Sequence, residues 1–469
     1  GMIHGENTVV ITYEVLEATR PFELDILPLL NGRSHHDLTK YRGDIYPESY
    51  INPDQSLFAR LNHDRTGIFM SVPGGAFHQQ PDWYFQFEYP VEMARGQGGH
   101  EDTFSPGHWT LNLEAGSAVA IVASTEPVAH RDGWALLDQE RARRLELQQS
   151  AEARHPLTRQ LTLAADQFIV KRGDNQKTII AGYPWFTDWG RDTMIALPGL
   201  CLFSGRAADA RNILDTFIDH VSDGMMPNRF PDAGGPALYN TVDGTLWFFV
   251  AVYHYFQQTG DQTFIRDRVL PVMDEIMTWH IQGTRYGIRQ EEDELLSAGE
   301  DGVQLTWMDA MVGDWVVTPR RGKAVEINAL WYNAWEIYAW LKDRMGVDAH
   351  IEQEKAARIR NRFQEVFWYE EGKYLYDYML DGYRDKSVRP NQIFAISLPF
   401  PALDASQAGE VLNIVETELL TPMGLRSLSP EDDAYLGRYT GDVYARDAAY
   451  HQGTVWSWLM GPYIDALIK

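Results

Sequence analysis

Cysteine and basic residues are scarce in this sequence of 469 residues. A single cysteine, Cys201, excludes an internal disulfide and is typical of a protein from a reducing compartment. Forty-one lysines and arginines stand against 66 aspartates and glutamates, which gives a formal net charge of −25. Nucleic-acid binding and docking to an anionic membrane surface both depend on clustered basic residues, so we expect neither partner.

Long apolar runs are missing as well. The longest, around residues 194–203, is far shorter than the ~20 residues that a membrane-spanning helix needs. The first ten residues lack the basic stretch and the apolar block of a secretory signal. Together with the acidic charge, these features predict a soluble, cytoplasmic protein.

Several motifs that mark cofactor or metal chemistry do not occur. The sequence has no G-x-x-x-x-G-K-S/T phosphate loop, no G-x-G-x-x-G after a predicted strand and no H-E-x-x-H. Its 14 histidines are scattered and have no cysteine partners at zinc-ligand spacing. No G-x-S-x-G motif indicates a serine hydrolase. We therefore expect no cofactor and no metal.

Aromatic residues, in contrast, are plentiful and make up 12% of the chain. Core packing accounts for many of them. Several, however, stand beside carboxylates and glycines rather than inside regular apolar stripes. Flat apolar rings next to hydrogen-bonding carboxylates suit a sugar, whose C–H faces stack while its hydroxyls need polar partners. A carbohydrate ligand is therefore expected.

The hydrophobic pattern divides the chain into three parts. Residues 1–130 alternate between apolar and polar side chains, as at 9–15 and 109–113, which predicts an antiparallel β-sandwich. Residues 131–154 are highly charged and predict a linking helix. From residue 155 to residue 469 the apolar period becomes helical, with about ten expected helices joined by loops rich in Gly, Pro, Asp and Trp. The expected fold is mostly α, with a large helical domain, interpreted as a helical barrel, after the sandwich.

The loop at residues 182–200 combines carboxylates with aromatic rings just before an apolar helix. Helix capping alone explains Asp192, with Arg191 paired to it. Capping does not explain the tryptophans of the same loop, so we favour a ligand-facing role. The candidate binding residues here are Trp185, Asp188, Trp189, Arg191 and Asp192.

The loop that opens the segment 305–334 holds the candidate catalytic group, Asp309. Its neighbours Trp307 and Met308 are apolar, and apolar surroundings favour the neutral form of a carboxyl, which a general acid needs before it donates a proton. Glu326 falls in the first turn of the following predicted helix. Stabilisation of the helix dipole and ligand binding are equally good interpretations of that glutamate.

Two further loops, at residues 387–399 and 444–462, complete the set. In the last of them His451, Gln452 and Trp456 are placed to hydrogen-bond and stack on a sugar ring. A helix-capping role for His451 is the alternative.

The motifs WFTDWGRD, TWMDAMVGDWVVTPR with AVEINALWYNA, RPNQIFAISLP and YHQGTVWSWLMGP resemble the glucosidase domain of glycogen debranching enzymes, the amylo-alpha-1,6-glucosidase family. The segments MIHGENTVVITYEV and DILPLLNGR resemble the later part of that family's N-terminal sandwich domain. The resemblance implies an (α/α)6 barrel of six helical hairpins over residues 155–469. It also implies inverting hydrolysis of the α-1,6-linked glucose at trimmed branch points of glycogen or limit dextrin, without cofactor or metal.

The same resemblance assigns roles to residues of this chain. It makes Asp309 of TWMD the general acid and places Asp188, Trp189, Arg191 and Asp192 around the terminal glucose. Family members also continue for about two more helices, which carry a catalytic glutamate, whereas this sequence stops at Lys469. The expectation is an incomplete barrel that binds glucose but hydrolyses α-1,6 linkages poorly alone. Asp447 is the least improbable replacement base.

Two other readings stay open at this point. One keeps the barrel but changes the reaction, as in a related α-glucosidase, a trehalase or a disaccharide phosphorylase, the last of which needs an anion site near Asp309. The other is a non-catalytic glucan-binding relative. The sequence does not indicate any protein partner.

Overall fold

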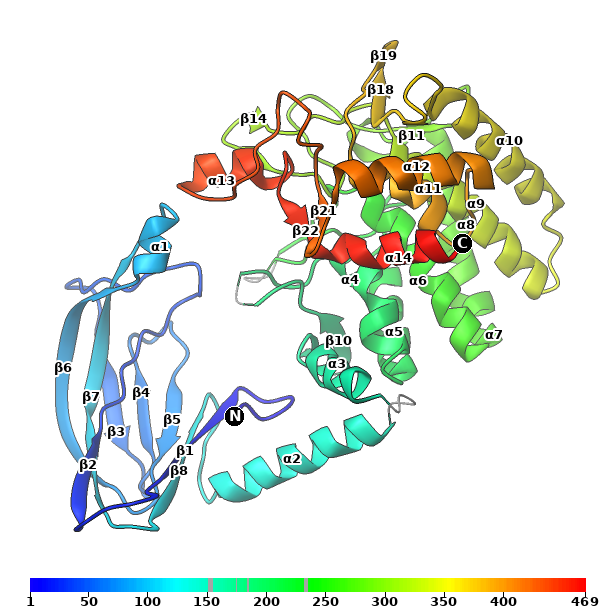
Figure 1. Ribbon diagram of the computed structural model, residues 1–469. Helices are drawn as coiled ribbons and strands as arrows, with labels where there is room; N and C mark the ends of the chain where they lie inside the picture. Colours follow the sequence, from blue (N-terminus) through cyan, green and yellow to red (C-terminus); the bar gives the residue numbers. More distant parts are fainter. Residues whose placement is uncertain (151–154, 174, 184, 232–234) are drawn as a thin grey trace. The chain divides into compact units, whose positions relative to one another are not determined.

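The computed structural model describes residues 1–150, 155–173, 175–183, 185–231 and 235–469 (Figure 1). It divides into two compact units, Gly1–Leu163 and Ala164–Lys469. Helices hold 39% of the residues and strands 22%. The chain is therefore a mixed helix and strand protein. The prediction of a mostly helical fold is too strong, because short antiparallel strands occupy many of the connections between helices.

The first unit is built on two antiparallel sheets. The larger has the strand order β1 (Thr8–Glu14), β8 (Ala118–Ser124), β5 (Ile68–Ser71), β4 (Leu57–Arg60), β3 (Glu48–Ile51). The smaller has the order β2 (Phe22–Ile26), β7 (His100–Leu113), β6 (Ala76–Glu88). Leu57 and Ile121 of the larger sheet share one buried core with Trp109 and Leu111 of the smaller. This core between two sheets is the structural outcome of the alternating pattern.

The opposite face of the larger sheet is covered by a helix. Val10 pairs with Val122 across β1 and β8, and both pack against Trp134 and Leu137 of α2 (Gly133–Ser150). Residues 151–154, the end of the predicted linking helix, lie outside the described residues. A short helix, α1 (Pro90–Ala94), follows β6. The helix α3 (Pro156–Asp166) spans the boundary between the units.

The second unit is dominated by helices (Figure 1). They are α4 (Gly190–Leu197), α5 (Ala207–Ile218), α6 (Asp243–Thr259), α7 (Gln262–Phe264), α8 (Leu270–Gln282), α9 (Val325–Arg344), α10 (His350–Phe367), α11 (Phe394–Ser397), α12 (Ala405–Glu418), α13 (Val443–Tyr450) and α14 (Met460–Ile468). Their arrangement as six hairpins around a barrel stays a prediction from the resemblance.

Helices α6 and α9 lie at the centre of this unit's core. Phe248 and Phe249 of α6, and Trp331 of α9, are almost completely buried. Both helices are apolar over most of their circumference, which is typical of helices enclosed by others. Helix α6 ends at Gly260, whose left-handed backbone (φ 62°) closes the last turn. The amino ends of α6 and α9 carry Asp243 and Glu326, both of which recur in the site below.

Short strands frame the loops of interest. The hairpin β13 (Met311–Val312) and β14 (Trp315–Val316) follows Asp309 directly. The sheet β15 (Lys323–Ala324), β18 (Tyr378–Leu380), β19 (Tyr383–Arg384) leads into α9, and β20 (Leu420–Thr421), β21 (Gly424–Arg426), β22 (Val455–Trp456) leads into α14. Four further short strands are β9 (Ile169–Arg172), β10 (Gln176–Ile179), β11 (Arg289–Gln290) and β12 (Leu296–Ser297), and β16 (Trp368–Tyr369) pairs with β17 (Tyr374–Leu375). Over the described ranges, no helix combines the length and the apolar character that crossing a membrane requires.

Candidate active site

Arg191 joins three parts of the second unit. It lies in the first turn of α4, and only 7% of its surface is exposed. Its Nε donates to Asp243 Oδ1 at the start of α6 over 2.7 Å, and its Nη1 donates to Asp309 Oδ2 over 2.9 Å. Its Nη2 lies 3.4 Å from the carbonyl oxygen of Leu305. One guanidinium therefore orients the candidate acid and ties its loop to two helices.

Asp309 is enclosed by protein yet reachable. Its side chain exposes 34% of its surface, so it is neither fully buried nor fully exposed. Burial raises the pKa of Asp309, the positive charge of Arg191 opposes this, and the negative charge of Asp243 adds to it. A raised pKa keeps more of the carboxyl protonated near neutrality, which is the state that a proton donor needs.

Asp192 and Tyr450 share the electrostatic environment of Asp309. Burial raises the pKa of Asp192 to about 6, with Arg191 opposing and the charge of Asp309 adding. Burial also raises the pKa of Tyr450 to about 12, and Asp309, Asp192 and Asp447 contribute in the same direction. These groups therefore form one cluster that interacts through charge, and their proton equilibria are linked.

An aromatic wall adjoins this cluster. The ring of Trp307 meets the rings of His451, Trp456 and Trp458 edge-on at 5.3, 5.6 and 5.3 Å. His451 stacks on Trp456 at 5.4 Å. Burial lowers the pKa of His451 well below its ordinary range, so the ring is neutral near pH 7. Trp307 is only 7% exposed, so its ring packs against the other aromatic rings and presents little surface to a ligand.

Two of the candidate binding residues, Glu326 and Gln452, accept hydrogen bonds from arginines. Both oxygens of Glu326 accept hydrogen bonds from Arg320, one of them over 2.6 Å, and Glu326 is 1% exposed. The Oε1 of Gln452 accepts from Arg389 Nη2 over 2.6 Å. Glu326 thus lies in a closed ion-pair network, whereas Gln452 lies beside His451 at the edge of one.

The rest of the 182–200 loop lies around α4. Asp188 is buried and bound by Arg172, and the hydroxyl of Thr178 donates to it over 3.1 Å. Trp189 precedes α4, and the guanidinium of Arg229 lies 5.7 Å from its ring. Trp185 is half-buried in the same loop. Of this loop's candidates, Arg191 contacts Asp309 directly, and Asp192 interacts with it through charge.

Sequence reasoning missed several residues of this region. Tyr450 precedes the predicted His451 and carried no signal beyond its aromatic ring. Asp243 stands 66 positions before Asp309, and no local pattern connects the two. Arg320, Asp377 and Arg389 were likewise not singled out, although Arg320 and Arg389 lie inside two of the predicted loops. Among the described residues, no group of three or more His, Cys, Asp or Glu side chains is placed to hold a metal ion.

Comparison with known proteins identifies the family of both units. Residues 163–469 match the amylo-alpha-1,6-glucosidase family, and residues 1–120 match the family "glycogen debranching enzyme N terminal". A glycogen debranching enzyme from Saccharomyces cerevisiae is 25% identical over 389 residues, which cover 63% of this chain and 25% of the yeast protein. A solabiose phosphorylase from Paenibacillus borealis is 26% identical over 229 residues, covering 44% of this chain and 28% of that enzyme.

The chain thus spans about a quarter of the length of the curated relatives it matches. The resemblance seen in the loop motifs is confirmed, since the family match covers all four of them. Glycosidases of the debranching type make up this family. The chain belongs to the amylo-alpha-1,6-glucosidase family of glycogen debranching enzymes.

Proposed function

We propose that this chain carries a glycoside hydrolase site that releases α-1,6-linked glucose from the branch points of glycogen or limit dextrin. The observation that carries the proposal is Asp309, a partly exposed carboxyl with a raised pKa that is oriented by Arg191 and follows the aromatic wall around Trp307. This combination suits a group that gives a proton to a glycosidic oxygen inside a sugar-binding recess.

In the proposed reaction the bond between the anomeric carbon and the glycosidic oxygen breaks as Asp309 protonates that oxygen. Water adds to the anomeric carbon and gives its proton to a base, and the products are glucose and a shortened glucan. The resemblance implies inversion, for which the acid and the base stand roughly 6.5–9.5 Å apart. Arg191 stabilises the Asp309 carboxylate that proton transfer leaves behind.

Two of the nearby carboxylates are poor candidates for the base. Asp188 is bound by Arg172, and both oxygens of Glu326 are bound by Arg320, so neither is free to accept a proton from water. We propose that Asp192, Tyr450 and Trp456, together with Trp185, Trp189 and Gln452, surround the terminal glucose, with the buried ring of His451 supporting Trp456. Trp307 and Asp188 support this pocket through their packing and pairing.

The direct test is glucose release from limit dextrin and from isomaltose, with Asp309→Asn beside the unmodified protein. Asparagine keeps the size of the side chain but has no acidic proton, so hydrolysis is expected to fall by roughly 10²–10⁴-fold. Calorimetric binding of glucose by Asp309→Asn shows that the pocket is intact. Full hydrolysis by this variant would remove Asp309 from the role.

Phosphorolysis is the second candidate, favoured by the similarity to a solabiose phosphorylase. It requires a phosphate site near Asp309. Arg191 is already occupied by Asp243 and Asp309, and Arg389 by two carbonyl oxygens and Gln452, an arrangement that favours water as the acceptor. Formation of glucose 1-phosphate that depends on added phosphate would support the alternative. Glucan binding without any release would indicate a non-catalytic relative.

A further inference from the structure

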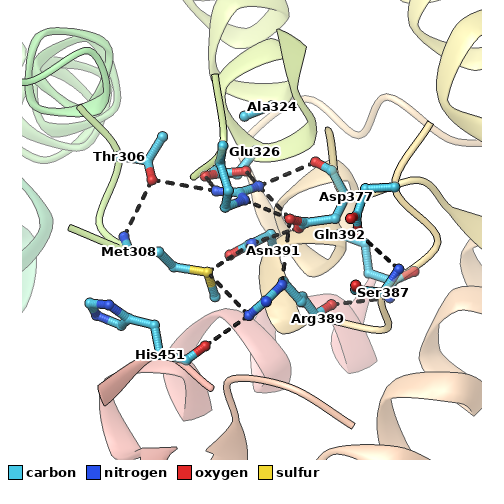
Figure 2. A network of polar contacts seen from close by, with 12 residues as sticks. Thr306, Met308, Ala324, Glu326, Asp377, Ser387, Arg389, Asn391, Gln392 and His451 are labelled. Atoms are coloured by element: carbon cyan, nitrogen blue, oxygen red, sulfur yellow. Dashed lines mark hydrogen bonds and ion pairs between the residues drawn. The ribbon is translucent and has the colours of Figure 1, made fainter. Parts of the chain in front are cut away.

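Three consecutive residues before Asp309 each make a polar contact, and Figure 2 shows those of Thr306 and Met308. The hydroxyl of Thr306 lies 3.5 Å from Arg320 Nη1. The indole Nε1 of Trp307 donates to Asn391 Oδ1 over 2.7 Å. The amide of Asn391 lies 3.5 Å from the sulfur of Met308. Each of the three side chains that precede the candidate acid therefore has a polar partner elsewhere in the unit.

The loop with His451 and Gln452 is fastened to the same groups. Arg389 Nη1 donates to the carbonyl oxygen of His451 over 2.8 Å, and its Nη2 donates to Gln452 Oε1 over 2.6 Å. The same Nη1 reaches the sulfur of Met308 at 3.9 Å. One arginine thus touches both the segment that precedes the acid and the segment proposed to close the sugar pocket.

A balanced set of buried charges holds these contacts in place. We call Arg320, Glu326, Asp377, Arg389 and Asn391 the Arg320 network. Arg320 binds Glu326 on one side and Asp377 on the other, the latter with Nε–Oδ2 at 2.6 Å and Nη2–Oδ1 at 3.0 Å. Asp377 Oδ1 accepts from the Asn391 amide over 2.7 Å, and its Oδ2 lies 3.7 Å from Arg389 Nε. Two arginines and two carboxylates therefore neutralise one another in a region where an unpaired charge would be costly.

Packing and polar contacts act together on the segment before Asp309, in which Leu305, Trp307 and Met308 belong to the buried core. Leu305, Thr306 and Met308 border a cavity of about 250 Å³, which Arg320 also lines. Atoms that face a void have no van der Waals partners on that side. The directional contacts of the Arg320 network therefore restrain this segment on the side where its packing is incomplete.

We propose that the Arg320 network sets the position of the Asp309 segment relative to the His451–Gln452 segment, with Glu326 and Asp377 as positioning residues rather than sugar ligands. This proposal rests on the hydrolase function proposed above. Asp309's own carboxylate is held by Arg191, which belongs to a separate set of contacts. Loss of the network should therefore misplace the acid without changing the groups that determine its pKa.

The experiment compares Asp377→Asn with the unmodified protein on two substrates. Isomaltose has a leaving group that needs a proton, whereas α-D-glucosyl fluoride releases fluoride with little help from an acid. We expect hydrolysis of isomaltose to fall roughly 10–100-fold, a size typical of misplacement by about 1 Å, and hydrolysis of the fluoride to fall much less. The alkaline limb of the pH profile should stay where it is, and calorimetry should show weaker binding of glucose.

Asp293→Asn is the matched control. Asp293 is also a largely buried carboxylate, paired with Lys323 at 2.7 Å near the start of α9, but it lies outside the Arg320 network. It should leave the ratio of the two rates and the glucose affinity unchanged. An equal fall of both rates in Asp377→Asn, with unchanged glucose affinity, would show a merely structural role and overturn the proposal.

A second variant covers the case in which Asp377→Asn does not fold. The double substitution Arg320→Met with Glu326→Leu removes one charge of each sign, and such neutral replacements often preserve stability. The folded double variant should show the same selective loss on isomaltose and the same weakening of glucose binding. Wild-type behaviour in both measurements would overturn the proposal. An unmodified protein that neither binds glucose nor cleaves either substrate would instead contradict the proposed function.

Discussion

Arg320 and Arg191 are both buried arginines that bridge two carboxylates, yet their surroundings differ. The two partners of Arg320, Glu326 and Asp377, each leave 2% of the side chain exposed. All four oxygens of these carboxylates are within hydrogen-bond or ion-pair reach of protein donors. Every oxygen of these two carboxylates is therefore occupied by a protein donor, so the cluster stabilises the structure and has no oxygen left to bind a ligand.

Arg191 pairs with one buried carboxylate and with one that is partly exposed. The side chain of Asp243 is 1% exposed, whereas that of Asp309 is 34% exposed. Arg191 makes one hydrogen bond to each carboxylate, whereas Arg320 makes two to each, and one partner of Arg191 stays partly exposed. The accessibility of one carboxylate is therefore what distinguishes the candidate reactive pair at Arg191 from the enclosed pairs at Arg320.

The largest expected difference concerns stability. Arg320→Met leaves two enclosed carboxylates without their main partner, which should lower the free energy of unfolding by roughly 3–5 kcal/mol. Arg191→Met should cost less, because Asp309 can hydrate or take up a proton. Urea unfolding of both variants measures the difference, and an equal or greater loss in Arg191→Met would contradict the distinction between a closed and an open cluster.

An intermediate effect is expected on the pH dependence of hydrolysis. Activity requires protonated Asp309, so the rate is high below its pKa and is lost as the pH rises through it. The charge of Asp243 raises that pKa, and its removal in Asp243→Asn also leaves Arg191 to interact more strongly with Asp309. Both effects move the alkaline limb to lower pH. Rates of isomaltose hydrolysis from pH 4 to 9 test this, with Asp293→Asn as the reference; an unmoved limb would contradict it.

The smallest effect is expected for Asp192→Asn. The charge of Asp309 raises the pKa of Asp192, and because like charges repel in both directions we expect Asp192 to raise the pKa of Asp309 as well. The substitution should move the alkaline limb in the same direction as Asp243→Asn, but by less, since Asp243 contributes more to the pKa of Asp309. Rates of isomaltose hydrolysis over the same pH range measure this shift. A limb that moves to higher pH would show that Asp192 acts on Asp309 in some other way.

The location proposed for the site follows from short stretches of sequence. Carboxylates set among tryptophans in loops before apolar helices marked residues 182–200 and 305–334, and Asp309 stood out through its apolar neighbours. Helix capping and ligand binding were equally good interpretations of Glu326. The structure provides a third, a bidentate pair with Arg320, six positions earlier in the sequence. Local pattern could not choose among them, because it shows the residue types near a carboxylate and not which cation reaches it.

The sequence by itself determined the periodicity of the two units, the loops proposed to carry the chemistry and the family of the chain. These depend on neighbouring residues, whose backbone preferences and apolar spacing act over a few turns. Only the tertiary structure decided that Arg191 meets Asp309 across 118 positions and that Trp307 meets Asn391 across 84. It also decided which carboxylates remain accessible. Exposure and pKa depend on every group that the fold brings near, and the packing of helices sets those distances, not the order of residues along the chain.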